Sequence, residues 1–189
     1  MIYLNDHIDA FDIHQALETV GPQRRQKALQ YRQERDQKLS LAVYLLLQEG
    51  LRKEYGIQDV PDFIFGKFGK PLLKGYPHIH FNLSHCREAA LCVVSESPVG
   101  CDIESVPSEL DMELCRHCFN EDEITYIEGS DQPTIAFAEL WTKKEAFLKL
   151  TGEGLVKDIP NVLCDTRVKK VSFETHVSWD KSYVYTVCR

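Results

Sequence analysis

The sequence lacks the long apolar runs of membrane-spanning and secreted proteins. Among its 189 residues, the most apolar stretch, 39–47, is far too short to cross a bilayer. The first ten residues have neither the basic segment nor the apolar run of a signal peptide. We therefore expect a cytoplasmic protein that has no membrane as a partner.

An excess of positive charge is missing too. The 22 Lys and Arg residues are outnumbered by 29 Asp and Glu residues, so the formal net charge is −7 at pH 7. Such a chain has no general attraction to nucleic acids or to anionic lipid surfaces. We expect no nucleic acid as a partner, and an acidic ligand would have to bind at a local basic patch.

The spacings of disulfide frameworks and of structural zinc sites are also absent. The seven cysteines are an odd number and are scattered along the chain, which favours reduced thiols in a cytosol. Cys115 and Cys118 are separated as in a zinc-binding pair, and histidines gather between positions 78 and 85. No second pair follows at a matching spacing, so we do not expect zinc.

The most informative segment that the chain does contain is 135–155. Its apolar residues share one sector of a helical wheel, which predicts an amphipathic helix packed on a core. Lys144 falls within the apolar sector, so its ammonium must either extend to solvent or meet a negative partner. Glu145 and Lys149 lie one turn apart on the flank of this helix. They could form an ordinary helix ion pair or serve a ligand.

Two acidic residues of a predicted strand form a second candidate site. In the strand predicted at 99–104, alternate apolar residues face one side, so Asp102 and Glu104 project from the other, about 7 Å apart. Like charges this close repel each other, which favours a cation between them. Exposed charges on a sheet edge are the alternative. An apolar run at 89–94 precedes this strand, and the turn between them predicts a hairpin.

Basic residues occur in two segments of the first half. Residues 23–54 predict one long helix whose first turns hold Arg24 and Lys27, where positive charge opposes the helix dipole. A solvated surface explains such residues by default, and anion binding is the alternative. The glycine-rich segment 66–71, GKFGKP, contains Lys70 but lacks the spacing of a phosphate-binding loop.

Two motifs together resemble the 4′-phosphopantetheinyl transferases of the surfactin-synthetase-activating type. They are VGCDIE at 99–104 and WTKKEAFLK at 141–149, in the order and separation found in that family. Weaker matches are GKP at 69–71, FNLSH at 81–85 and the basic opening of the long helix. Cys101 replaces the usual aliphatic residue, Thr142 stands where serine is common, and Lys38 lies near a position where arginine is more usual.

The resemblance implies an α/β (α+β) fold and a substrate. The family fold is a pseudo-dimer of two similar lobes, each with a small antiparallel sheet packed on a long helix. We place the lobes at 1–97 and 98–189 and expect coenzyme A to bind between them as substrate. The transferase family modifies apo acyl carrier proteins or carrier domains, so we expect such a partner. We also expect the chain to act as a monomer.

The resemblance also implies a metal and its ligands. A magnesium ion on the coenzyme A pyrophosphate would be held by Asp102, Glu104 and Glu145. Three carboxylates that leave sites for phosphate oxygens and water suit this hard octahedral cation. By the same resemblance, Lys144 and Lys149 would lie near the pyrophosphate.

The nucleotide end of coenzyme A would meet the first half of the chain. The resemblance implies that Arg24, Ser84 and His85 bind the 3′-phosphate, with Lys27 nearby. Lys70 would lie beside the nucleotide.

The mechanism that the resemblance implies is a phosphoryl transfer. A serine of the carrier protein attacks the β-phosphorus, and 3′,5′-ADP leaves with the developing negative charge. Magnesium and Lys149 would stabilise that charge. Glu145 is the predicted base, directly or through water, and Glu123 is the second choice. The expected catalytic residues are therefore Glu145, Lys149 and Asp102.

Two other classes of function stay open from the residues alone. A different magnesium-dependent phosphotransferase or phosphodiesterase could use the same carboxylates on another pyrophosphate. A non-catalytic module could bind coenzyme A or a carrier protein, although a binder would not need all three carboxylates.

Overall fold

The first half of the chain forms a three-stranded antiparallel sheet covered by a long helix. The structure, a computed structural model, describes residues 1–154 and 158–189. The sheet order is β1 (Ile2–Asn5), β5 (Ala90–Ser95), β4 (His80–His85). Helix α3 (Glu34–Tyr55) packs on it because its apolar stripe shares one core cluster with the strands. This half also contains a 3-10 turn (Ile8–Ala10), α1 (Ile13–Thr19), α2 (Pro22–Leu29), and the hairpin of β2 (Phe63–Phe65) and β3 (Pro71–Leu73).

The second half repeats the combination of a small sheet with a long helix. Its antiparallel sheet has the order β6 (Gly100–Ser105), β8 (Tyr183–Cys188), β7 (Phe173–Val177). Helix α6 (Pro133–Thr151) packs across β6 and β8 and buries Phe147 and Leu148 there. This is the helix predicted at 135–155; residue 155 lies outside the described residues. The remaining elements are α4 (Met112–Cys118), α5 (Glu121–Glu128), and 3-10 turns at Ile159–Cys164 and Thr166–Lys170.

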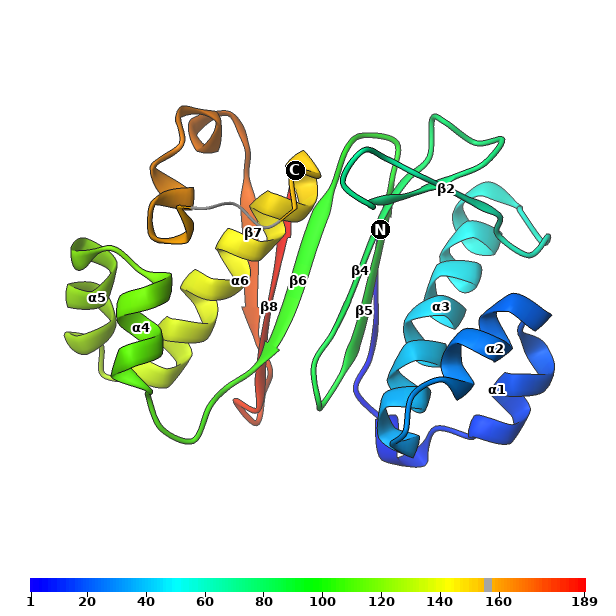
Figure 1. The fold of residues 1–189 in the computed structure, drawn as a ribbon, viewed down its shortest axis with the longest axis horizontal. Helices are drawn as coiled ribbons and strands as arrows, with labels where there is room; N and C mark the ends of the chain where they lie inside the picture. Colours follow the sequence, from blue (N-terminus) through cyan, green and yellow to red (C-terminus); the bar gives the residue numbers. More distant parts are fainter. Residues whose placement is uncertain (155–157) are drawn as a thin grey trace.

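The two sheets lie side by side in the middle of the molecule, with α3 on one flank and α4 and α5 on the other (Figure 1). The predicted α/β (α+β) class, with small antiparallel sheets and long helices, agrees with this architecture. The predicted boundary between 1–97 and 98–189 falls in the turn between β5 and β6, and the pseudo-dimer stays a prediction. None of the helices in 1–154 and 158–189 is both long and apolar enough to cross a bilayer.

A hydrophobic cluster joins the two halves. The apolar face of β6, formed by Val99, Cys101 and Ile103, packs against Leu91 and Val93 of β5, and all five residues are fully buried. The alternation predicted for 99–104 is therefore confirmed. Because the apolar face points toward the first half, the opposite face of β6 is left for the acidic residues.

The prediction of one continuous helix at 23–54 is wrong, because the helix is interrupted between α2 and α3. At the break, Gln33 adopts an extended conformation and becomes the N-cap of α3. The apolar residue of α2 that is buried, Ala28, packs in a cluster with Leu41 and Tyr44 of α3. A continuous helix could not fold back onto itself, so the turn is what allows α2 to pack across α3.

The hairpin predicted for 89–94 and 99–104 is also wrong. Strand β5 pairs with β1 along one edge and with β4 along the other, and β6 pairs with β8 instead. A strand has only two edges for backbone pairing. Because both edges of β5 are occupied, the turn after β5 sends the chain into the second sheet.

Gly100 sets how closely β6 approaches α6. A Cβ atom at this position would overlap the Ala146 carbonyl oxygen and the Leu150 nitrogen, which are backbone atoms of α6. Backbone atoms held in a helix cannot move aside as a flexible side chain can. Only glycine therefore allows the contact that brings the acidic strand beside the helix.

We predict that Gly100→Ala lowers the free energy of unfolding by about 3 kcal/mol or more, because overpacking is not relieved by rotation of a side chain. Thermal and urea unfolding measure the loss. Gly66→Ala is the matched control, since a Cβ atom there would lie 3.6 Å from its nearest neighbour, the Lys70 carbonyl oxygen. Equal stability of the two variants would contradict the close packing of β6 on α6.

Candidate functional site

Three side chains from three elements meet at the junction of the two halves. The Lys149 ammonium of α6 lies 2.5 Å from Oδ1 of Asp102 on β6. Ser84 of β4 donates to the same oxygen at 2.8 Å, and its hydroxyl accepts from the Lys149 ammonium at 3.0 Å. Lys149 thus pairs with Asp102 rather than with Glu145 one turn earlier, so an ordinary helix ion pair does not describe it.

Two further carboxylates face this pair. Burial and the nearby Asp102 carboxylate raise the pKa of Glu104 to about 7, and the same two causes raise the pKa of Glu145. The indole of Trp141 donates to Glu104 at 3.2 Å. Lys149 lowers the pKa of both glutamates but does not cancel the effects of burial and of the Asp102 charge. The site therefore holds more negative charge than its own ammonium neutralises.

Asp102 leaves one carboxylate oxygen unused. Its Oδ2 atom is buried and has no hydrogen-bond partner among the described residues. A buried oxygen without a partner is costly, which favours a ligand at this point. Within 1–154 and 158–189, no group of three or more His, Cys, Asp or Glu side chains is already arranged around a common point as a metal site. The donor types nevertheless suit a hard divalent cation.

The Lys149 ammonium keeps its proton. Burial by itself would lower its pKa, but the carboxylates of Asp102 and Glu145 outweigh burial, and the pKa is raised. A protonated lysine beside a cavity can bind or stabilise the negative charge of a phosphate.

A second group of basic side chains lies on the first-half side. Burial and the Lys149 ammonium lower the pKa of His85, and the charge of Arg24 acts in the same direction. The Arg24 guanidinium donates to the carbonyl and hydroxyl oxygens of Ser40 and lies 5.0 Å from the ring centre of Tyr44. Lys27 is exposed on α2, the helix that carries Arg24. The charges of Asp36 and Asp102 act on His85 in the opposite direction, so basic and acidic groups both surround this imidazole.

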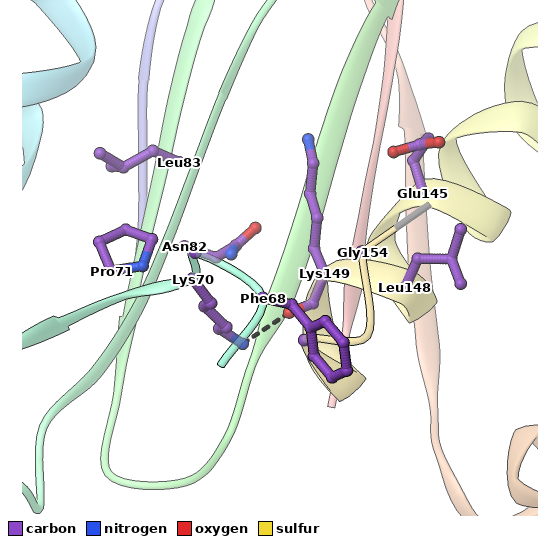
Figure 2. Close-up of a pocket in the computed structure, with 11 residues that line it drawn as sticks. Phe68, Lys70, Pro71, Asn82, Leu83, Glu145, Leu148, Lys149 and Gly154 are labelled. Atoms are coloured by element: carbon purple, nitrogen blue, oxygen red, sulfur yellow. Dashed lines mark hydrogen bonds between the residues drawn. The ribbon is translucent and has the colours of Figure 1, made fainter. Parts of the chain in front are cut away.

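A cavity of about 340 Å³ opens between the two halves, and the predicted site residues that line it are Lys70, Glu145 and Lys149. Figure 2 shows Lys70, Asn82 and Leu83 on one side of it and Glu145, Lys149 and Leu148 on the other. Phe68 and Asn82 also line it, although the sequence did not predict either as a site residue. Asn82 also accepts from the Cys101 backbone N–H at 2.9 Å, which ties β4 to β6.

Lys70 lines this cavity with its side chain, but its ammonium is engaged elsewhere. It donates to three backbone carbonyls, those of Val99, Lys149 and Leu150, at 3.2, 2.6 and 3.2 Å. A lysine has three N–H donors. All three therefore have partners within the chain.

The structure does not bring Lys144 to the other predicted site residues. Its side chain is 0% exposed and pairs with Glu123 at 2.7 Å, and it also donates to the carbonyls of Ile159 and Pro160. Of the two outcomes predicted for this lysine, it meets a negative partner rather than solvent. Glu123 also forms a capping box with Asn120 at the start of α5, so its carboxylate serves both the helix start and Lys144.

Comparisons with known proteins find a family and several relatives. A family model described as the 4′-phosphopantetheinyl transferase superfamily matches residues 98–188. A 4′-phosphopantetheinyl transferase of Bacillus subtilis is 30% identical over 159 residues, which are 82% of this chain and 70% of the relative. The 4′-phosphopantetheinyl transferase Sfp of Bacillus subtilis (strain 168) is 27% identical over 158 residues, with the same coverage. The 4′-phosphopantetheinyl transferase gsp of Aneurinibacillus migulanus is 37% identical over 118 residues, 58% of this chain and 48% of that protein.

We predict that Lys144→Met is destabilised by about 3–5 kcal/mol, because the change leaves the Glu123 carboxylate without its buried partner. Lys144→Met combined with Glu123→Gln should recover much of the loss, since glutamine keeps the cap of α5 without the charge. Lys143→Met, one position earlier on α6, is the control and should unfold like the native chain. Chemical denaturation measures all four proteins. A native-like Lys144→Met would contradict a structural role for the buried pair.

Proposed function

Because this chain belongs to the 4′-phosphopantetheinyl transferase superfamily, we propose that the residues around the cavity between its two halves bind coenzyme A and carry out the transfer. The enzyme transfers the 4′-phosphopantetheine group of coenzyme A to a serine of a carrier protein and releases 3′,5′-ADP. The observation that supports this assignment of the site most directly is the contact of Lys149 with Asp102 and Ser84 beside that cavity. This contact brings together a protonated lysine, a hydroxyl and a carboxylate with one unpaired oxygen. The first two can donate to phosphate oxygens, and the carboxylate can bind a metal ion.

The pyrophosphate of coenzyme A would bind at Lys149. Its ammonium is protonated and lies at the cavity, where it can donate to a phosphate oxygen. The family resemblance implies that Ser84 binds the 3′-phosphate. Because its hydroxyl contacts both Asp102 and Lys149 in this structure, we propose that it donates to the pyrophosphate instead. The raised pKa of Lys149 supports this assignment, because the lysine would remain a cation throughout the reaction.

The 3′-phosphate would bind the basic group of the first half. Arg24 and His85 lie near enough for the charge of Arg24 to lower the pKa of His85. A dianionic phosphate would favour the protonated imidazole and so return a proton to His85. Lys27, exposed on the same helix as Arg24, would contribute at longer range.

We do not assign Lys70 and Lys144 to the ligand, because their ammonium groups already have partners within the protein.

The residues present suit a magnesium ion, which would be held by Asp102, Glu104 and Glu145. The unpartnered Oδ2 of Asp102 and the raised pKa values of both glutamates support this set, since a divalent cation would satisfy the oxygen and remove the repulsion. When bound, such an ion supplies positive charge to the pyrophosphate oxygens.

Glu145 is the proposed base for the carrier serine. The serine hydroxyl would give its proton to Glu145 while its oxygen forms a bond to the β-phosphorus, and the bond from that phosphorus to the bridging oxygen breaks. The electron pair leaves with 3′,5′-ADP, whose new charge lies within reach of Lys149. Glu145 lines the cavity together with Lys149, so its carboxylate lies where a carrier serine would meet the pyrophosphate. Glu123, the other base considered, is paired with Lys144.

The experiment that tests the function is intact-mass analysis of an apo carrier protein incubated with this chain, coenzyme A and magnesium. We expect the carrier to gain one phosphopantetheine group. Lys149→Ala should lose about 100-fold or more in single-turnover rate at temperatures where thermal melting shows it to be folded, because one charge-stabilising donor is removed. Lys143→Ala is the control on the same helix. No mass gain with fatty-acid, polyketide or peptide-synthetase carriers would overturn the function, and a fully active Lys149→Ala would overturn the role of Lys149.

The metal is tested separately from the transfer. We expect titration calorimetry to detect magnesium binding to the native chain with coenzyme A, and no comparable binding to Asp102→Asn, which keeps the size of the side chain but loses its charge. EDTA should abolish transfer by the native enzyme. Transfer that persists at full rate in EDTA, or equal magnesium binding by both proteins, would rule out the carboxylate set as a metal site.

A further inference from the structure

Lys70 connects the end of α6 to the start of β6. Its ammonium donates to the carbonyls of Lys149 and Leu150, in the last turn of α6, and to the carbonyl of Val99, which precedes β6. Figure 2 shows the bond to the Lys149 carbonyl and, at the other end of the same residue, the Lys149 ammonium directed into the cavity. The backbone of a residue at the site is therefore held by a lysine from the other half of the chain.

The chemistry of a helix end explains why a lysine is suited to this position. The last carbonyls of a helix have no partner within it, and they carry the negative end of the helix dipole. The Leu148 carbonyl is satisfied by the N–H of Gly152, the left-handed C-cap residue of α6. The next two carbonyls, of Lys149 and Leu150, are the ones that Lys70 satisfies. A cation with three donors serves these acceptors without leaving a buried donor unpaired.

The local sequence holds Lys70 in place for this contact. In the turn before it, the N–H of Gly66 donates to the Lys70 carbonyl at 2.9 Å, and Gly69 has a φ of +82° that favours glycine. The stem of Lys70 also packs on α6, since a Cβ atom at Gly152 would lie 3.3 Å from its Cδ. The segment GKFGKP is thus a turn that directs one lysine across the cavity to the opposite helix end.

We infer that Lys70 is a positioning residue for the transfer: it holds the last turn of α6 against β6 and thereby sets where the Lys149 ammonium lies in the cavity. The inference rests on the proposed function and differs from a contact between Lys70 and coenzyme A. A ligand contact would use the ammonium as a donor to phosphate. In this structure the ammonium is committed to carbonyls, and its effect reaches the substrate through Lys149.

The two roles differ in their kinetics. Lys70→Met keeps the length of the stem and removes the three hydrogen bonds. We expect kcat to fall by about 100-fold, because a small displacement of a group that acts in the transition state has a large effect on rate. Kd for coenzyme A by calorimetry should weaken no more than it does in Lys149→Ala, because any loss of binding is transmitted through the same ammonium. Lys67→Met, in the same turn and with its ammonium over the Phe68 ring, removes an equal charge and should leave kcat unchanged.

Combining the two substitutions tests whether Lys70 affects the rate through Lys149. If Lys70 acts by placing Lys149, adding Lys70→Met to Lys149→Ala should lower kcat no further, because the group being placed is gone. Independent, multiplying losses would overturn the inference. So would a Lys70→Met protein with native kcat and weakened coenzyme A binding, or one with lowered thermal stability alone. If Lys70→Met does not fold, Lys70→Gln can be compared in the same way, since its side chain ends in a neutral polar amide.

Failure of this inference can be told apart from failure of the proposed function. If the function is wrong, the native chain itself transfers nothing to an apo carrier. If only the inference is wrong, the native chain is active and the Lys70 variants depart from the pattern described.

Discussion

Strand β6 and helix α6 approach each other with no side chain between them at Gly100, and the geometry of the site depends on that contact. The strand carries Asp102 and Glu104, while the helix carries Glu145 and Lys149. Because the backbones touch at Gly100, the Lys149 ammonium comes within hydrogen-bond distance of the Asp102 carboxylate. A larger spacing would separate the lysine from the aspartate and open the floor of the cavity.

The electrostatic balance of the site follows from this proximity. Three carboxylates share a partly buried region with one lysine, so the lysine is stabilised as a cation while two of the carboxylates are made less acidic. Such an arrangement is unfavourable in isolation and becomes favourable when a cation and a polyanion enter together. The site is therefore suited to a ligand that brings both charges, as a metal–pyrophosphate does.

Local patterns in the sequence predicted the parts of the site that lie on single elements. Alternation placed Asp102 and Glu104 on one face of a strand, and helical spacing placed Glu145 and Lys149 on one flank. The motifs added the family, which the relatives confirm. Side-chain periodicity could not predict which groups these side chains contact. Lys149 pairs with Asp102 on another element, and Lys70 donates to backbone carbonyls. The break before α3 and the pairing of β5 likewise depend on contacts between segments distant in the sequence.

The cluster shared by β5 and β6 has a consequence for how the chain folds. Apolar side chains from both halves, among them Leu91, Val93 and Ile103, are fully buried against one another. Separating the halves would expose these faces to water, at about 25 cal/mol for each Å² of apolar surface. The segment 98–188, which the family model matches, would then present an uncovered sheet face. We therefore expect the two halves to fold and unfold as one cooperative unit, with the site assembled only when both are in place.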